Sequence, residues 1–246
     1  MAARKPNDSP DSPRRDDGPP RAGGVICYRC KAPFDGTGCL CADGITLIHG
    51  DCREVLPLIA PGSVDLVLTD PPYGMDYQSA WRIGWQRKEK IQGDDAFPMW
   101  LFDFKPSVAM FVCCRWDNLF DMPRPKSFIV WDKCRHGMGD LQHEFGRQWE
   151  AIAFYPGPSH RFTRRPIDLI RVPCIPPDKL LHPNEKPAAI FKPIIESHAG
   201  LILDPFAGSG TTLRAAKDLG RRCIGIEIEE KYCDIAANRL RQEVLF

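Results

Sequence analysis

The chain has 246 residues, and its 33 lysines and arginines against 32 aspartates and glutamates give a formal net charge of +1. Hydrophobic residues make up 43% and charged residues 26%, as in ordinary globular domains. The length suits one substantial domain with a small accessory element. This small net charge excludes a strongly basic protein that binds nucleic acid through its overall charge, but it does not exclude a local basic face. No apolar run approaches the ~20 residues that cross a bilayer, and no apolar secretory leader is evident, so we expect a cytoplasmic protein without a membrane partner.

The first 24 residues differ in composition from the rest of the chain. They hold five prolines, three glycines and nine charged residues, with few apolar side chains. Such a segment cannot bury enough surface to offset its ordering entropy. We therefore expect residues 1–24 to form a disordered tail.

Cysteine is abundant, with 11 residues in a chain too long for a small disulfide scaffold. Within residues 25–44, Cys27-x-x-Cys30 is followed by Cys39-x-Cys41. Four thiolates suit a tetrahedral zinc ion, and this spacing predicts a small zinc knuckle. Only one residue separates the second pair, so unliganded cysteines are the alternative.

From residue 45 onward, short apolar runs alternate with amphipathic stretches. Runs that are nearly continuous in apolar residues are typical of strands buried on both faces. The expected strands are 45–49, 64–69, 108–113, 128–131, 150–155, 201–203 and 223–228, and the clearest helices are 210–219 and 229–241. This alternation predicts an α/β fold over residues 45–246: a Rossmann-like, mostly parallel seven-stranded sheet with helices on both faces.

The most informative stretch is Asp70-Pro71-Pro72-Tyr73, which follows the second expected strand. Ligands of parallel sheets bind just outside the carboxyl ends of the strands, so Asp70 is expected at a cleft. The rigid prolines fix the direction of the backbone carbonyls. A carboxylate beside a fixed carbonyl offers two acceptors to an exocyclic amine, and Tyr73 offers a flat face to a planar base. A strand that simply ends in a Pro-Pro turn is the alternative.

A second motif lies far downstream, where an expected strand leads through a glycine-rich turn into a helix. Gly208 and Gly210 permit close approach of a ligand, and the helix start offers unpaired N–H groups. The spacing is neither that of the dinucleotide fingerprint nor that of a phosphate loop. Glu227, at the end of the next strand, suits a ribose diol. The pattern favours a nucleoside cofactor without a pyrophosphate.

Asp70-Pro71-Pro72-Tyr73 followed by Phe206-Ala207-Gly208-Ser209-Gly210, with His182-Pro183-Asn184-Glu185-Lys186-Pro187 between them, resembles the S-adenosylmethionine-dependent DNA amino methyltransferases. The likeness is to their permuted β group, in which the catalytic half precedes the cofactor half, and it covers roughly residues 45–241. It implies methyl transfer from S-adenosylmethionine to N6 of an adenine flipped out of double-stranded DNA. Aspartate at position 70 favours adenine, and cytosine N4 is the alternative.

The resemblance also implies roles for individual residues. Asp70, Pro71, Pro72 and Tyr73 would be catalytic. Lys186 would close over the methionine part of the cofactor, or be a solvated loop lysine, and Asp51 would lie near its adenine, or cap a helix. The implied cofactor site consists of Asp51, Asp70, Lys186, Asp204, Phe206, Ala207, Gly208, Ser209, Gly210, Thr211 and Glu227.

Two segments are candidates for DNA contact. Residues 157–181 occupy the place of the family's target-recognition region and carry His160, Arg161, Arg164, Arg165 and Arg171, with a solvated basic loop as the alternative. Residues 75–97 interleave aromatic and basic residues, as expected of a mobile loop that closes on DNA. The zinc knuckle of Cys27, Cys30, Cys39 and Cys41 would help DNA recognition or anchor the N-terminus.

Two other hypotheses about the function compete with that of a DNA methyltransferase. One is a DNA-binding protein that has kept the fold without activity, and the other is an enzyme that modifies RNA or a protein amide. We expect a monomer or homodimer in a bacterial or phage-infected cell, associated with the nucleoid, with any restriction endonuclease as a separate protein. The target sequence and the biological role stay open.

Overall fold

The computed structural model describes residues 25–37, 41–75, 82–83, 86–87, 93–136, 142–143, 145–180 and 185–242. The predicted disordered tail, residues 1–24, and Cys39 of the predicted zinc knuckle lie outside them. None of the helices in this part of the chain has the length and apolar character needed to cross a membrane.

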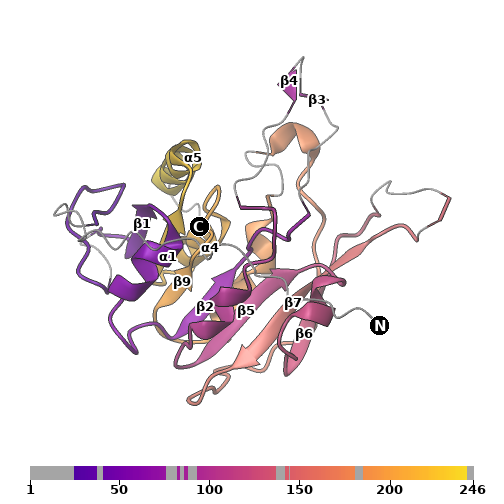
Figure 1. Cartoon of the computed structure of the whole chain (residues 1–246), viewed down its shortest axis with the longest axis horizontal. Helices are drawn as coiled ribbons and strands as arrows, with labels where there is room; N and C mark the ends of the chain where they lie inside the picture. The colour runs from indigo at the N-terminus through magenta and orange to yellow at the C-terminus, as the bar shows by residue number, and fades with distance from the viewer. Residues whose placement is uncertain are drawn as a thin grey trace, which may run out of the picture.

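An eight-stranded sheet forms the centre of the protein, in the order β1-β10-β9-β2-β5-β7-β6-β8 (Figure 1). Its strands are β1 (Ile45–His49), β2 (Leu66–Thr69), β5 (Ala109–Cys114), β6 (Ser127–Asp132), β7 (Trp149–Pro156), β8 (Leu169–Arg171), β9 (Ile202–Asp204) and β10 (Cys223–Glu227). All neighbours are parallel except at β7, which runs antiparallel to β5 and β6. The inner strands are buried along nearly their whole length, which explains their continuous apolar runs.

Helices cover both faces of this sheet. One face packs against the 3-10 turn η4 (Ala188–Ile190) and the helices α3 (Lys192–Glu196), α4 (Thr211–Asp218) and α5 (Glu230–Arg241). The other packs against α1 (Cys52–Val55), η1 (Leu56–Leu58), η2 (Met99–Asp103) and α2 (Asn118–Asp121). Alternate residues of each strand enter the two layers, as Leu66 and Val67 of β2 do.

The sequence predicted this class of fold correctly but missed one strand. All seven expected strands are present, and the two expected helices correspond to α4 and α5. The eighth strand, β8, lies within the segment 157–181 and pairs with β6. Only its middle residue, Ile170, is buried, so it presents no apolar run to recognise.

Three neighbouring parallel strands bring the two predicted motifs together. Asp70 directly follows β2, Asp204 ends β9, and Glu227 ends β10. Because these strands are adjacent and parallel, their carboxyl ends meet at one edge of the sheet. Residues more than 130 positions apart in the sequence thus lie on the same side of the sheet.

Smaller elements complete the structure. The Cys-rich segment packs beside β1, where Cys27 forms a bridge to Ile48. Within the predicted loop 75–97, β3 (Arg82–Ile83) and β4 (Gln86–Arg87) form a hairpin that projects from the body of the protein in Figure 1. Closure of this loop on DNA stays a prediction. The 3-10 turn η3 (Pro177–Lys179) follows β8.

Candidate active site

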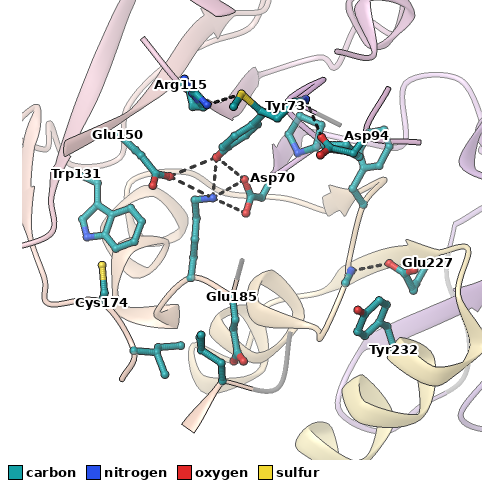
Figure 2. Close-up of a pocket in the computed structure, with 18 of the residues that line it drawn as sticks. Asp70, Tyr73, Asp94, Arg115, Trp131, Glu150, Cys174, Glu185, Glu227 and Tyr232 are labelled. Carbon is teal, nitrogen blue, oxygen red and sulfur yellow. Dashed lines mark hydrogen bonds and ion pairs between the residues drawn. The ribbon is translucent and has the colours of Figure 1, made fainter. Parts of the chain in front are cut away.

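A cavity of about 510 Å³ opens at the carboxyl edge of β2, β9 and β10. Figure 2 shows Asp70 and Tyr73 at its centre, with Glu227 and Tyr232 toward one end and Trp131 toward the other. The predicted residues that line it are Asp70, Pro71, Pro72, Tyr73, Lys186, Phe206, Gly208 and Glu227. The two motifs therefore contribute to one cavity.

Lys186 lies at the centre of a network of charged groups. Its partners Asp70, Tyr73 and Glu150 point toward one another in Figure 2. Its Nζ donates to both carboxylate oxygens of Asp70, at 2.6 and 2.5 Å, and to the Tyr73 hydroxyl oxygen at 2.7 Å. The Tyr73 hydroxyl in turn donates to Asp70 Oδ1 at 2.8 Å. Glu150 Oε2 lies 3.4 Å from Lys186 Nζ, and Lys133 Nζ lies 3.2 Å from Glu150 Oε1. Two ammonium groups thus neutralise two carboxylates.

The network shifts the pKa values of Asp70, Glu150 and Lys186. Burial raises the pKa of the Asp70 carboxyl, and the Lys186 ammonium opposes that rise. Burial also tends to raise the pKa of the Glu150 carboxyl, but Lys186 and Lys133 hold this pKa below the ordinary value. Burial alone would lower the pKa of Lys186, whereas the Asp70 and Glu150 carboxylates raise it above its usual range. Lys186 therefore stays a cation at neutral pH.

The turn after Tyr73 is held from several sides. Asp94 Oδ1 accepts hydrogen bonds from the backbone N–H groups of Gly74 and Met75, at 3.0 and 3.3 Å, and Asn118 Nδ2 donates to the Tyr73 carbonyl at 3.0 Å. Gly74 has φ +73°, and a Cβ at this position would lie 2.6 Å from the Phe97 backbone nitrogen. Only glycine fits this turn without a shift of the backbone.

Glu227 and the glycine-rich turn form the opposite end of the cavity. Glu227 Oε2 accepts a hydrogen bond from Gly208 N at 2.8 Å, and Oε1 accepts one from Glu229 N at 2.8 Å. Burial raises the pKa of this carboxyl, and the two backbone donors oppose the rise. Each oxygen keeps a lone pair for a further donor, such as a ribose hydroxyl.

Some predicted cofactor residues lie beside the cavity instead of lining it. Asp51 caps α1, where its carboxylate accepts a hydrogen bond from Arg53 N at 2.8 Å and pairs with the Arg53 guanidinium. A helix cap was the alternative role that the sequence suggested for this residue. Asp204 is buried under the turn, where it accepts from the Thr69 hydroxyl at 2.7 Å and Phe206 N at 3.1 Å. Burial raises the pKa of Asp204 to about 6.

The other predicted residues of the glycine-rich turn also lie behind the wall that the described residues form around the cavity. Ala207, Ser209 and Thr211 are buried, and Thr211 Oγ1 accepts from Arg239 Nη1 at 3.3 Å. Gly210 has φ +81°, and a Cβ there would lie 2.9 Å from Ala236 Cβ. This glycine therefore lets α5 approach the start of α4. Direct contact of these residues, Asp51 and Asp204 with a cofactor stays a prediction.

Several cavity residues were missed at the sequence level, among them Arg115, Trp131, Lys133, Glu150 and Tyr232. Glu150 lies near the start of an expected strand, and starts of parallel strands face away from the ligand. Because β7 is antiparallel, its first residues lie at the cavity instead. Trp131 is the partner of Glu150 on β6, and its Nε1 donates to the Val172 carbonyl at 2.8 Å.

The predicted target-recognition segment, residues 157–181, divides between two edges of the sheet. Gly157 N donates to Val108 O and Ser159 N to Ser107 O, just before β5 begins, so the first part lies at the edge opposite the cavity. His160 packs there against Phe154 and His198. Arg171 belongs to β8 and pairs with Asp132 at 2.9 Å. Of the described residues of this segment, only Cys174, Ile175 and Leu180 line the cavity.

Comparison with solved structures identifies the type of fold. The complex of M1.HpyAVI with SAM superposes with a TM-score of 0.59 and 22% sequence identity, over 80% of this chain and 99% of that one. The shared fold is that of a methyltransferase with a mostly parallel sheet.

Comparison of sequences identifies the family. The family model N6_N4_Mtase, described as DNA methylase, matches residues 64–238, and the chain belongs to this family. Escherichia coli (strain K12) YubD, named as a methylase, is 31% identical over 78% of this chain and 88% of its own length. The DNA adenine methyltransferase YhdJ of the same organism is 28% identical over 79% of this chain and 82% of its own length.

Proposed function

We propose that this DNA methylase transfers a methyl group from S-adenosylmethionine to the exocyclic N6 of an adenine flipped out of double-stranded DNA. The observation that carries the proposal is one cavity with Asp70 and Tyr73 at its centre and Glu227 at its end. Aspartate at position 70 and the similarity to YhdJ favour adenine. Cytosine N4 is the alternative, since the family includes both chemistries and both targets are exocyclic amines.

The Glu227 end of the cavity suits the nucleoside part of the cofactor. The two carboxylate oxygens are already fixed by Gly208 N and Glu229 N, so they accept from ribose hydroxyls without reorientation. Phe206 adds an apolar wall beside them. When bound, S-adenosylmethionine supplies an electrophilic methyl group on its sulfonium.

The Asp70 end suits the target base. A stacked base cannot present its amine in line with the methyl group, so it must leave the duplex. Asp70 and the Pro71 carbonyl would accept the two N–H bonds of the amine, and Tyr73 and Trp131 offer aromatic faces to the ring. Asp70 can keep its bonds to Lys186 while accepting the amine, because Oδ2 accepts one bond from Lys186 and has a second lone pair.

Asp70 would act on the amine through position and charge. Methyl transfer would leave positive charge on the amine nitrogen, and the nearby Asp70 carboxylate would stabilise it there. The amine then releases a proton, and the raised pKa of the buried Asp70 carboxyl suits it to take that proton up. No covalent intermediate with the protein is needed.

The DNA would lie over exposed aromatic residues beside the cavity. A second depression, of about 580 Å³, shares Arg147 with the cavity and is also lined by Trp116, Phe145 and Trp149. These three aromatics are exposed, and Phe145 is 98% exposed. Aromatic faces stack on unpaired bases, and arginine binds phosphates. This surface replaces His160 and Arg161 as our candidate for DNA contact.

The test is mass analysis of nucleosides after incubation of unmethylated DNA with the protein and S-adenosylmethionine. We expect N6-methyladenine from the wild type and from Asp103→Ala, an exposed control, and none from Asp70→Ala. Isothermal titration should show that Asp70→Ala still binds S-adenosylmethionine. N4-methylcytosine would overturn the choice of base. Wild-type protein that binds cofactor and DNA without methylating either base would overturn the catalytic proposal.

A further inference from the structure

Three cysteines of the N-terminal element converge on one point. The sulfurs of Cys27, Cys30 and Cys41 all lie within 4.8 Å of one another, and those of Cys27 and Cys41 are 3.9 Å apart. Cys27 is fully buried, Cys41 is partly buried and Cys30 is exposed. The cluster lies outside the walls of the catalytic cavity.

This spacing fits ligands of one tetrahedral metal ion. Zinc–thiolate bonds of about 2.3 Å at tetrahedral angles place two sulfurs about 3.8 Å apart. A disulfide needs about 2.05 Å and would join only two of the three thiols. The convergence of all three is therefore better explained by a shared ion.

The turn that carries the first two cysteines is shaped like a metal knuckle. Lys31 N donates to the Cys27 carbonyl at 2.9 Å, and Cys27 N donates to the Ala32 carbonyl at 2.9 Å, so the chain reverses tightly around Cys30. Lys31 adopts φ +60°, a conformation that a side chain disfavours. An ion bound inside the turn would offset this local cost.

The knuckle lies against a terminal strand of the sheet. Strand β1 is terminal in the sheet, and Tyr28 N donates to the Leu47 carbonyl at 2.6 Å. The Tyr28 hydroxyl donates to Asp234 of α5 at 2.8 Å, and the Arg29 guanidinium forms two bonds with Asp43 at 2.7 and 2.9 Å. Unpaired edge strands invite association with other chains, and this element covers the edge.

We infer that Cys27, Cys30 and Cys41 bind one structural zinc ion, which fastens the N-terminal element over the edge of β1. Soft thiolates in a tetrahedral arrangement select zinc over magnesium or calcium. Cys39, the predicted fourth ligand, lies outside the described residues, and the inference rests on the other three. The ion takes no part in catalysis and is independent of the proposed function.

Elemental analysis of the purified full-length protein tests this inference. We expect about one zinc per chain in the wild type and a loss of most of it in Cys41→Ser. Cys134→Ser, which removes an exposed cysteine far along the sequence from the cluster, should retain the wild-type content. Zinc-free wild-type protein from zinc-supplemented cells, iron in place of zinc, or full zinc retention in Cys41→Ser would each overturn the inference.

A second measurement covers the case in which Cys41→Ser fails to fold. Wild-type protein stripped with a chelator should show a melting temperature lower by about 5 °C or more, restored by zinc but not by magnesium. Cobalt added to the stripped protein should give thiolate-to-metal charge-transfer absorption. An unchanged melting temperature together with no such absorption would contradict a structural zinc site.

Discussion

Replacing Lys186 by methionine should destabilise the protein strongly. The Lys186 side chain is 6% exposed and pairs with Asp70 at 2.5 Å and Glu150 at 3.4 Å. Methionine keeps most of the side-chain volume but removes the ammonium. Two carboxylates would then share a buried site, with Lys133 as the remaining cation beside Glu150.

The size of the effect follows from the two distances. At an effective dielectric constant of about 20, opposite charges 2.5 Å apart attract by about 7 kcal/mol, and those 3.4 Å apart by about 5 kcal/mol. Burying the ammonium costs several kcal/mol, and the variant avoids this cost because it has no ammonium to bury. We therefore expect Lys186→Met to lower the free energy of unfolding by about 3–5 kcal/mol at neutral pH, as is typical when one partner of a buried pair is removed.

The loss should shrink as the pH falls. Without Lys186, burial raises the pKa of the Asp70 and Glu150 carboxyls in the folded state above their unfolded values. The folded variant then binds more protons than the unfolded chain, so its stability increases on acidification. In the wild type, the pKa of Glu150 is lowered in the folded state. The stability that this carboxylate contributes is therefore lost, not gained, as the pH falls. The difference between the two proteins should therefore be smaller at pH 5 than at pH 8.

Urea denaturation at pH 5, 6.5 and 8 measures both effects. Lys192→Met is the matched control, because Lys192 is 40% exposed and its partner Asp218, at 3.3 Å, keeps a second cation, Arg214, at 2.7 Å. Such pairs contribute about 0–1 kcal/mol. The reasoning is refuted if both variants lose the same stability, or if the loss in Lys186→Met does not depend on pH.

Two further substitutions test the two ends of the cavity. Gly74→Ala should lower kcat/KM by at least about tenfold, because a Cβ would press on Phe97 N and displace the turn that carries Tyr73. Gly62→Ala is its control, since Gly62 has a similar φ of +74° with open space around it, and its activity in the methylation assay should be unchanged. Glu227→Gln should weaken binding of S-adenosylmethionine about 10- to 100-fold in isothermal titration, because a charged hydrogen bond contributes about 1.5–3 kcal/mol. Exposed Glu230→Gln should bind as the wild type does, and equal affinities of the two variants would contradict the assignment of Glu227.

The sequence revealed those parts of the site that follow parallel strands. Asp70 and Glu227 stand at the ends of continuous apolar runs, and the edge at which such runs end is the same for every parallel neighbour. That rule placed the two residues in one cavity across 157 positions of sequence. Lys186 was found through its motif, but its ion pair with Asp70 was not foreseen, since no local pattern reports a contact between residues 116 positions apart.

The direction of β7 explains why the positions of Glu150 and His160 were not predicted from the sequence. The run 150–155 looks like any other buried strand, and nothing local shows that it runs against its neighbours. Its reversal brings Glu150 to the cavity and carries His160 to the opposite edge. The missed carboxylate and the position of His160 away from the cavity therefore have one physical source.

The arrangement of charges in the cavity reflects two competing demands of the proposed reaction. A lone buried carboxylate would stabilise positive charge on the amine most strongly, but burial raises the pKa of Asp70 and favours its neutral form. Lys186 opposes that rise and favours the ionised form of Asp70, and Glu150 and Lys133 balance the remaining charge. The network thus gives up part of the attraction between Asp70 and the amine but stabilises the ionised form of the acceptor. A cation at position 186 that contacts both oxygens of Asp70 meets both demands, which explains why the lysine lies against the proposed catalytic carboxylate.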